Sequence, residues 1–284
     1  MPMTLLLGFI AGVTILLGLP IGRMQRPAPN LRVLLNALAI GVLLFLFWDV
    51  ISAAWEPIDA ALSAVHDGSG GLSPVFGYGV LFAGGLSIGL LGLVGYDRAM
   101  ARAKNRQRRV GPGAMSVAER PGRVGWSAAR RLSLLIAVGI GLHNFAEGLA
   151  IGQAAARNAI ALATVLVIGF ALHNATEGFG IVAPLAADKD IDGVDTRPGW
   201  PFLLGMAAIG GGPTFIGTAI GHNFTSEPVS VIFLTLAAGS ILYVVVQLLN
   251  VAARAKRADL VTYGLLLGLL AGFITDAIVT AGGA

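Results

Sequence analysis

The chain has 284 residues, of which 56% are hydrophobic and only 12% are charged, and its formal net charge at pH 7 is +4. A soluble domain carries about a quarter charged residues, so this composition excludes an ordinary soluble enzyme and indicates a polytopic membrane protein. The absence of cysteine excludes disulfides, thiolate metal sites and a cysteine nucleophile.

Apolar segments recur along the whole chain, and each approaches or exceeds the roughly 20 residues that a helix needs to cross a bilayer. The first lacks a basic leader and a convincing cleavage site, so we expect a retained span and not a signal peptide. The prediction is an all-α membrane protein with a single transmembrane domain over residues 1–284. Its eight transmembrane helices are expected at 3–22, 33–55, 75–97, 131–155, 159–186, 200–221, 229–250 and 260–282.

The basic residues separate the two sides of the membrane. All 19 Lys and Arg residues except Arg157 fall in the first, third, fifth and seventh connectors. Cationic connectors stay in the cytoplasm, so both termini are expected outside it, and a bacterial plasma (inner) membrane is the expected location. The third connector, about 98–130, is the longest and the most basic. Membrane topology, together with contact with anionic membrane lipid, therefore accounts for the positive charge, and nucleic acid is not an expected partner.

An acidic residue stands inside the second span. Asp49 lies between the apolar runs on either side of it, next to Trp48. It could relay metal or protons along a pathway, or it could sit at the outer interface with the neighbouring tryptophans. Both interpretations remain open from the sequence.

The hexapeptide His-Asn-x-x-Glu-Gly occurs in the fourth span as 143–148 and again in the fifth span as 173–178. Positions i and i+4 share one face of a helix, so each His lies one turn from its Glu. His143 follows Arg131 by 12 residues, which is about 18 Å along a helix and near mid-membrane. A short connector makes the two spans antiparallel neighbours, as in the inverted repeats of transporters.

Two imidazoles and two carboxylates at one point would form a nitrogen and oxygen ligand set for a divalent transition metal. The amide oxygens of Asn144 and Asn174 could serve a second ion. The alternative is polar helix packing, but ionised carboxylates at mid-membrane cost several kcal/mol, order of magnitude, and packing is served more economically by Ser or Thr. The predicted ligands are His143, Glu147, His173, Glu177, Asn144 and Asn174.

Three later features also suggest a pathway. The acidic run Asp188, Asp190 and Asp192 follows the fifth span and resembles the start of a calcium loop, although Gly199 stands where that loop needs Glu. The run Gly210–Pro213 either bends the sixth span or allows close packing. Asp276, in the eighth span, could likewise relay metal or protons along a pathway or sit near the membrane interface, as Asp49 could.

With the doubled motif, eight spans and a long cytoplasmic third connector, the chain resembles the ZIP (Zrt/Irt-like) family of divalent metal transporters over nearly its whole length. The resemblance implies a binuclear site between the fourth and fifth spans. Its primary metal would be held by the His and Glu residues of the two motifs, and its second metal by the two Asn residues and the shared glutamates.

The chain departs from the family pattern at several positions. Family members commonly have Pro before the motif glutamate, where this chain has Ala146 and Thr176. They often have Glu-Pro in the sixth span, where this chain reads Gly212-Pro213, so the second metal site is expected to be weaker or missing. In the seventh span, family members often have a His-Glu pair near the cytoplasmic exit, and this chain has Gln247 there.

The expected function is transport of a divalent metal ion toward the cytoplasm, with Zn²⁺ as substrate or a related ion (Fe²⁺, Mn²⁺, Co²⁺ or Cd²⁺), without an organic cofactor. The sequence does not fix the physiological metal or the coupling mechanism, and a homodimer remains open. One rival is a non-transporting membrane metal sensor. An enzyme is not expected, because an intramembrane metalloprotease would need His-Glu-x-x-His, and Asn occupies the second position in both motifs.

Overall fold

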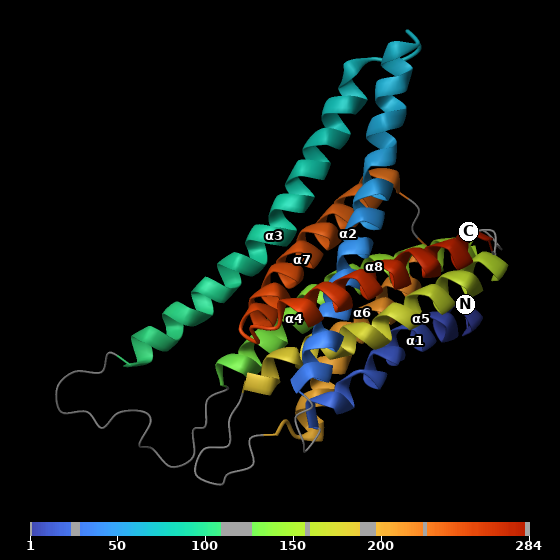
Figure 1. The fold of residues 1–284 in the computed structure, drawn as a ribbon. Helices are drawn as coiled ribbons and strands as arrows, with labels where there is room; N and C mark the ends of the chain where they lie inside the picture. The colour runs from blue at the N-terminus through green and yellow to red at the C-terminus, as the bar shows by residue number, and fades with distance from the viewer. Residues whose placement is uncertain are drawn as a thin grey trace.

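The structure is a computed structural model, and it describes residues 2–23, 29–108, 127–156, 160–187, 197–223 and 226–281 (Figure 1). Every regular element within these ranges is helical. Eight helical segments there are long and apolar enough to cross a membrane. The predicted all-α fold with eight spans is therefore confirmed.

The first span is divided into an α-helix followed by two tighter helical turns, α1 (Pro2–Val13), η1 (Thr14–Leu17) and η2 (Leu19–Arg23). The fifth span likewise ends in a tight turn, η4 (Ala183–Ala187). The other elements are α2 (Pro29–His66), α3 (Leu72–Arg108), α4 (Ala128–Ala156), α5 (Ile160–Val182), α6 (Trp200–Gly221), α7 (Glu227–Ala253) and α8 (Ala258–Ala281).

Helices α2 and α3 are longer than the apolar segments that predicted them. Together they form a hairpin that projects beyond the rest of the bundle (Figure 1). Hydropathy marks only the apolar part of a helix, and Ala, Arg, Lys and Gln continue a helix well in water. The stretch 98–108, which we expected in the third connector, is therefore the last part of α3.

The Gly-Gly-Gly-Pro run does not divide the sixth span, because α6 continues as one α-helix through Pro213. Close packing explains Gly210 and Gly211, whereas a Cβ atom on Gly212 would meet nothing within 4 Å. A Cβ atom on Gly211 would lie 2.1 Å from the carbonyl oxygen of Gly12, and one on Gly12 would lie 2.3 Å from the carbonyl oxygen of Gly211. The backbones of α1 and α6 thus meet directly, and the span that is interrupted is the first.

The helix contacts follow an inverted repeat. The main contacts between helices are matched in pairs. They correspond to one another when α1 is exchanged with α6, α2 with α7, α3 with α8 and α4 with α5. The contact of α4 with α6 corresponds to that of α5 with α1, and α3 with α7 corresponds to α2 with α8. Helices α4 and α5 contact each other at the centre of this arrangement. This is the pattern expected of a transporter bundle with its site between two central helices.

Candidate metal centre

The two hexapeptides lie in the middle of α4 and α5, inside the bundle. All six of their His, Asn and Glu residues are buried, and none exposes more than 7% of its surface. The apolar residues on either side bury these helices against their neighbours. Four ionisable groups are thus held away from water, where they need partners.

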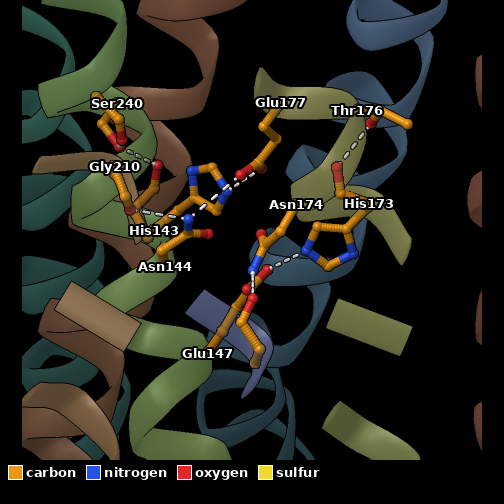
Figure 2. A network of polar contacts seen from close by, with 12 residues as sticks. His143, Asn144, Glu147, His173, Asn174, Thr176, Glu177, Gly210 and Ser240 are labelled. Atoms are coloured by element: carbon orange, nitrogen blue, oxygen red, sulfur yellow. Dashed lines mark hydrogen bonds and ion pairs between the residues drawn. The ribbon is translucent and has the colours of Figure 1, made fainter. Parts of the chain in front are cut away.

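The imidazole of each motif contacts the carboxylate of the other motif (Figure 2). His143 Nε2 lies 2.5 Å from Glu177 Oε1, and His173 Nε2 lies 2.7 Å from Glu147 Oε1. This crosswise arrangement follows from the equal spacing of two antiparallel motifs. The residue that begins the motif on one helix faces the glutamate near the end of the motif on the other helix.

Both asparagines are anchored by backbone carbonyls of helices outside the central pair. Asn144 Nδ2 donates to the carbonyl oxygen of Gly210 on α6 at 3.0 Å, and also to Glu177 Oε2 at 3.2 Å. Asn174 Nδ2 donates to the carbonyl oxygen of Ala11 on α1 at 3.0 Å. The two bonds to backbone are related by the inverted repeat. Because each amide nitrogen donates to a neighbouring helix, the amide oxygen of each Asn is the atom left to accept a ligand.

Four buried polar atoms of the motifs have no hydrogen-bond partner: His143 Nδ1, Asn144 Oδ1, Glu147 Oε2 and Asn174 Oδ1. Unpaired buried polar atoms are uncommon in proteins, and several on adjoining side chains indicate a binding site. Three of the four are oxygen acceptors suited to a cation. Among the described residues, however, no three His, Cys, Asp or Glu side chains converge as a set that could hold one metal ion. The four-ligand site stays a prediction.

Neighbouring contacts hold the motif backbone in place. Ser240 Oγ on α7 donates to the carbonyl oxygen of Gly139, one turn before His143, at 3.0 Å. Thr176, which stands where the family pattern has Pro, donates its Oγ1 to the carbonyl oxygen of His173 at 2.7 Å. Such hydrogen bonds back to the preceding turn often bend helices, so this Thr affects the same turn that Pro would.

The glycines that end the motifs bring α4 and α5 against their outer neighbours. A Cβ atom on Gly148 would lie 2.1 Å from the carbonyl oxygen of Thr214 on α6. One on Gly178 would lie 2.4 Å from the carbonyl oxygen of Ile15 in η1. Neither position can accept a side chain without a backbone shift. These glycines therefore allow close helix approach, and their partners are α6 and the first span.

The two acidic residues predicted within spans lie near one another. Asp49 on α2 interacts electrostatically with Asp276 on α8, and also with Glu147 and His173 of the central site. Both aspartates are partly exposed. The structure thus places Asp49 within electrostatic range of both Asp276 and the central site.

The remaining predicted pathway residues do not join this group. Gln247 is half-buried on α7, four residues after Tyr243. Asp188, Asp190 and Asp192 lie outside the described residues.

The carbonyl groups of Ala11 and Gly210 are the site components that the sequence reasoning missed. A main-chain carbonyl carries no residue-type signal, and each lies far along the chain from the Asn that it anchors. The equal spacing of the motifs could have indicated the crosswise His–Glu pairs, because antiparallel helices with equal spacing place His opposite Glu.

Comparison with known proteins agrees with this geometry. A family profile described as "ZIP Zinc transporter" matches residues 115–279. Proteins named "Zinc transporter ZupT" from Escherichia coli O1:K1 / APEC and from Escherichia coli (strain K12 / DH10B) are each 30% identical to the chain over 287 residues. These alignments cover 99% of the chain and 99% of each relative. The chain belongs to the ZIP zinc transporter family.

Proposed function

We propose that the protein carries a divalent transition metal ion, foremost Zn²⁺, across the membrane toward the cytoplasm through the buried centre between α4 and α5. The observation that carries this proposal is the set of two crosswise His–Glu pairs, whose buried side chains include four unpaired polar atoms. Membership of a transporter family confirms the expectation that the chain is not an enzyme.

The proposed primary ligands are His143, Glu147, His173 and Glu177. The carboxylates neutralise the charge of the ion in a medium where an unpaired cation is costly, and the imidazoles favour borderline-soft ions over Mg²⁺ and Ca²⁺. Each imidazole already touches the carboxylate of the other helix, so a metal ion between the pairs would replace those contacts with coordination bonds. Small movements of α4 and α5 would gather all four ligands.

Asn144 and Asn174 are the proposed ligands of a second, weaker ion. Their amide nitrogens are held by backbone carbonyls, and their amide oxygens are buried without a partner. The structure describes no carboxylate from α6 at this position, because Gly212 stands where the family pattern has Glu. The second ion would then have only the amide oxygens and the glutamates that it shares with the primary ion, which is why it is expected to bind weakly.

Zn²⁺ is the first choice of substrate because nitrogen and oxygen donors suit it and because the relatives are named zinc transporters. Fe²⁺, Mn²⁺, Co²⁺ and Cd²⁺ accept the same donors. Competition by each ion against Zn²⁺ uptake would rank them.

The proposed entrance is the side of the centre where Asp49 and Asp276 lie, since two carboxylates attract a cation toward the site. The opposite end of the bundle carries the basic connectors and faces the cytoplasm under the positive-inside rule. Gln247 belongs to that half, on the way out. We also propose that the protein lies in a bacterial plasma membrane with both termini outside the cytoplasm, and that it forms a homodimer.

The test is uptake of ⁶⁵Zn into proteoliposomes, comparing wild type with Glu147→Ala/Glu177→Ala. We expect the double variant to lose at least 95% of the initial rate. The matched control is Glu56→Ala/Asp59→Ala, which removes two exposed carboxylates from α2 outside the centre and should keep the wild-type rate. Thermal unfolding of each variant shows whether the fold is intact.

The outcomes separate the rival functions. Equal flux in the folded double variant would remove the paired motifs from the mechanism. Tight zinc binding without flux in the wild type would favour the non-transporting sensor. Accumulation of ⁶⁵Zn in intact cells expressing the protein, compared with loss of preloaded ⁶⁵Zn, decides the direction.

A further inference from the structure

The hydroxyl group of Thr214, in α6, is buried and has no hydrogen-bond partner. A threonine inside a helix can donate its Oγ1 to the carbonyl oxygen four residues earlier, because that carbonyl lies one turn away on the same face. Within the described helices this bond, 2.7–2.9 Å long, is made by Thr218, Thr235, Thr262 and Thr275. The unpartnered hydroxyl of Thr214 departs from this pattern at a fully buried position.

The carbonyl group four residues before Thr214 is that of Gly210, and it already serves the metal centre. Asn144 Nδ2 donates to this carbonyl oxygen at 3.0 Å (Figure 2). The continuous helix α6 gives the same oxygen a backbone N–H as well. Because a carbonyl oxygen has two lone pairs, none is left for the hydroxyl of Thr214. The hydroxyl of Thr214 and the amide of Asn144 thus stand beside the same oxygen atom.

Thr214 also lies next to the anchor of the second asparagine. A Cβ atom placed on Gly12 of α1 would lie 3.3 Å from the Cβ atom of Thr214. The preceding residue of α1, Ala11, is the one whose carbonyl oxygen accepts the bond from Asn174 Nδ2. The side chain of Thr214 is therefore held between the two places where neighbouring helices anchor the asparagines.

Position 212, where the family pattern has Glu, faces elsewhere. Gly212 lines an apolar groove between α1 and α6, and a Cβ atom on it would meet nothing within 4 Å. Two residues along an α-helix turn through about 200°, so Thr214 lies on the opposite face of α6 from Gly212. The side-chain oxygen that α6 directs to the inside of the bundle at this level is therefore the hydroxyl of Thr214.

We propose that Thr214 is a specificity-determining residue, whose hydroxyl oxygen coordinates the second ion and makes that position selective for a hard divalent ion such as Mn²⁺. This inference rests on the second ion of the proposed function. Asn144 Oδ1, Asn174 Oδ1 and Thr214 Oγ1 are three buried, neutral and unpartnered oxygen atoms. Oxygen ligands suit Mn²⁺, whereas imidazole nitrogen draws Zn²⁺ to the primary position. The two positions thus differ in the kind of ion that they retain.

The experiment measures Mn²⁺ binding to the detergent-purified full chain preloaded with one equivalent of Zn²⁺, by loss of the electron paramagnetic resonance signal of free Mn²⁺. We expect the wild type to bind one Mn²⁺ per chain. Thr214→Val keeps the shape of the side chain without the hydroxyl and should weaken Mn²⁺ binding at least tenfold. It should change the affinity for the first Zn²⁺ less than twofold. Thr214→Ser keeps the hydroxyl and should bind Mn²⁺ within threefold of the wild type.

Thr218→Val is the matched control, because it removes a buried hydroxyl one turn later whose bond stays inside α6. It should change Mn²⁺ binding less than twofold. The melting temperature of the metal-free protein separates binding from folding. Removing an unpartnered buried hydroxyl removes a desolvation cost, so Thr214→Val should melt at or above the wild-type temperature.

Several results would overturn the role of Thr214. They are a lower melting temperature of Thr214→Val, Mn²⁺ binding that survives in it, Mn²⁺ binding that is lost in Thr214→Ser, or no Mn²⁺ binding to the wild type. Each would leave zinc transport through the primary ligands standing. The proposed function fails by a different result, namely zinc flux that survives removal of Glu147 and Glu177.

Discussion

At the residue scale, the buried glutamates are stabilised by side chains of the opposite helix. Glu177 accepts contacts from His143 and Asn144 of α4, and Glu147 contacts His173 of α5. Removing one partner from a buried charged pair leaves the other charge without compensation. The residues that stabilise each other are therefore the His and Glu of opposite helices, and not the His and Glu of one hexapeptide.

A double-mutant cycle measures this directly. His143→Ala and Glu177→Ala should be non-additive in the free energy of unfolding, with a coupling of about 0.5–3 kcal/mol, as for residues in direct contact. His143→Ala with Glu147→Ala, on one helix, should show a smaller coupling. The measurement is denaturant unfolding in metal-free detergent. A larger coupling for the same-helix pair would contradict the crosswise geometry.

The two asparagines should differ in their effect on transport. Asn144 donates to Glu177 as well as to Gly210, whereas Asn174 donates to the carbonyl oxygen of Ala11. Groups that orient a metal ligand typically change affinity by about 10–100-fold when removed. Asn144→Ala should therefore raise the KM for zinc uptake about tenfold, and by more than Asn174→Ala does. Asn223→Ala, an exposed control at the end of α6, should leave KM unchanged.

At the element scale, close contacts between helix backbones set the position of the centre. The motif glycine of α4 meets the backbone of α6, and that of α5 meets η1. These contacts hold the central helices against the elements that also supply the carbonyls for the asparagines. Helix spacing and ligand orientation consequently depend on the same interfaces.

Adding one methyl group tests that dependence. In Gly148→Ala the new Cβ would lie 2.1 Å from a main-chain carbonyl oxygen, which cannot rotate away. We expect a loss of about 1–3 kcal/mol in unfolding free energy, as for an overpacked core, together with slower zinc uptake. Gly212→Ala is the matched control in α6, because its Cβ would meet nothing within 4 Å. It should be neutral or slightly stabilising, since Ala favours a helix over Gly. Equal melting temperatures for the two variants would contradict the close contact.

At the scale of the whole molecule, the two ends of the bundle differ in charge. The ends of α2, α3, α4 and α7 at the connectors expected in the cytoplasm carry exposed or half-buried arginines, among them Arg32, Arg98, Arg130 and Arg254. The opposite end includes the α2–α3 turn, where Asp67 and His66 are exposed. This asymmetry predicts one orientation in the membrane.

The natural absence of cysteine makes the orientation easy to measure. Ser69→Cys, in the α2–α3 turn, should react with a membrane-impermeant maleimide on intact cells. Ala258→Cys, at the start of α8, should react only after the cells are permeabilised. Both positions are exposed, and the unmodified chain supplies the unlabelled background. The reverse labelling pattern would invert the proposed direction of transport.

The extent of prediction from sequence varies with the kind of feature. Apolar length located all eight spans, because crossing a bilayer requires it whatever the neighbours are. It placed the ends of α2 and α3 too early, because polar residues up to His66 and Arg108 continue the helices beyond their apolar parts. The sequence left open whether Gly210–Pro213 bends the sixth span or allows close packing, and it gave no sign of the interruption after Val13, because packing against other helices decides where a backbone can bend.

Local spacing by itself determined that His143 and Glu147, like His173 and Glu177, share a helix face inside an apolar span, because these relations lie within one turn of one helix. The choice of donors likewise limited the chemistry to a divalent transition metal. Only the tertiary structure decided that each His meets the Glu of the other helix and that Ala11 and Gly210 anchor the asparagines. Those contacts join residues far apart in the chain, so they depend on the register and distance at which the helices pack.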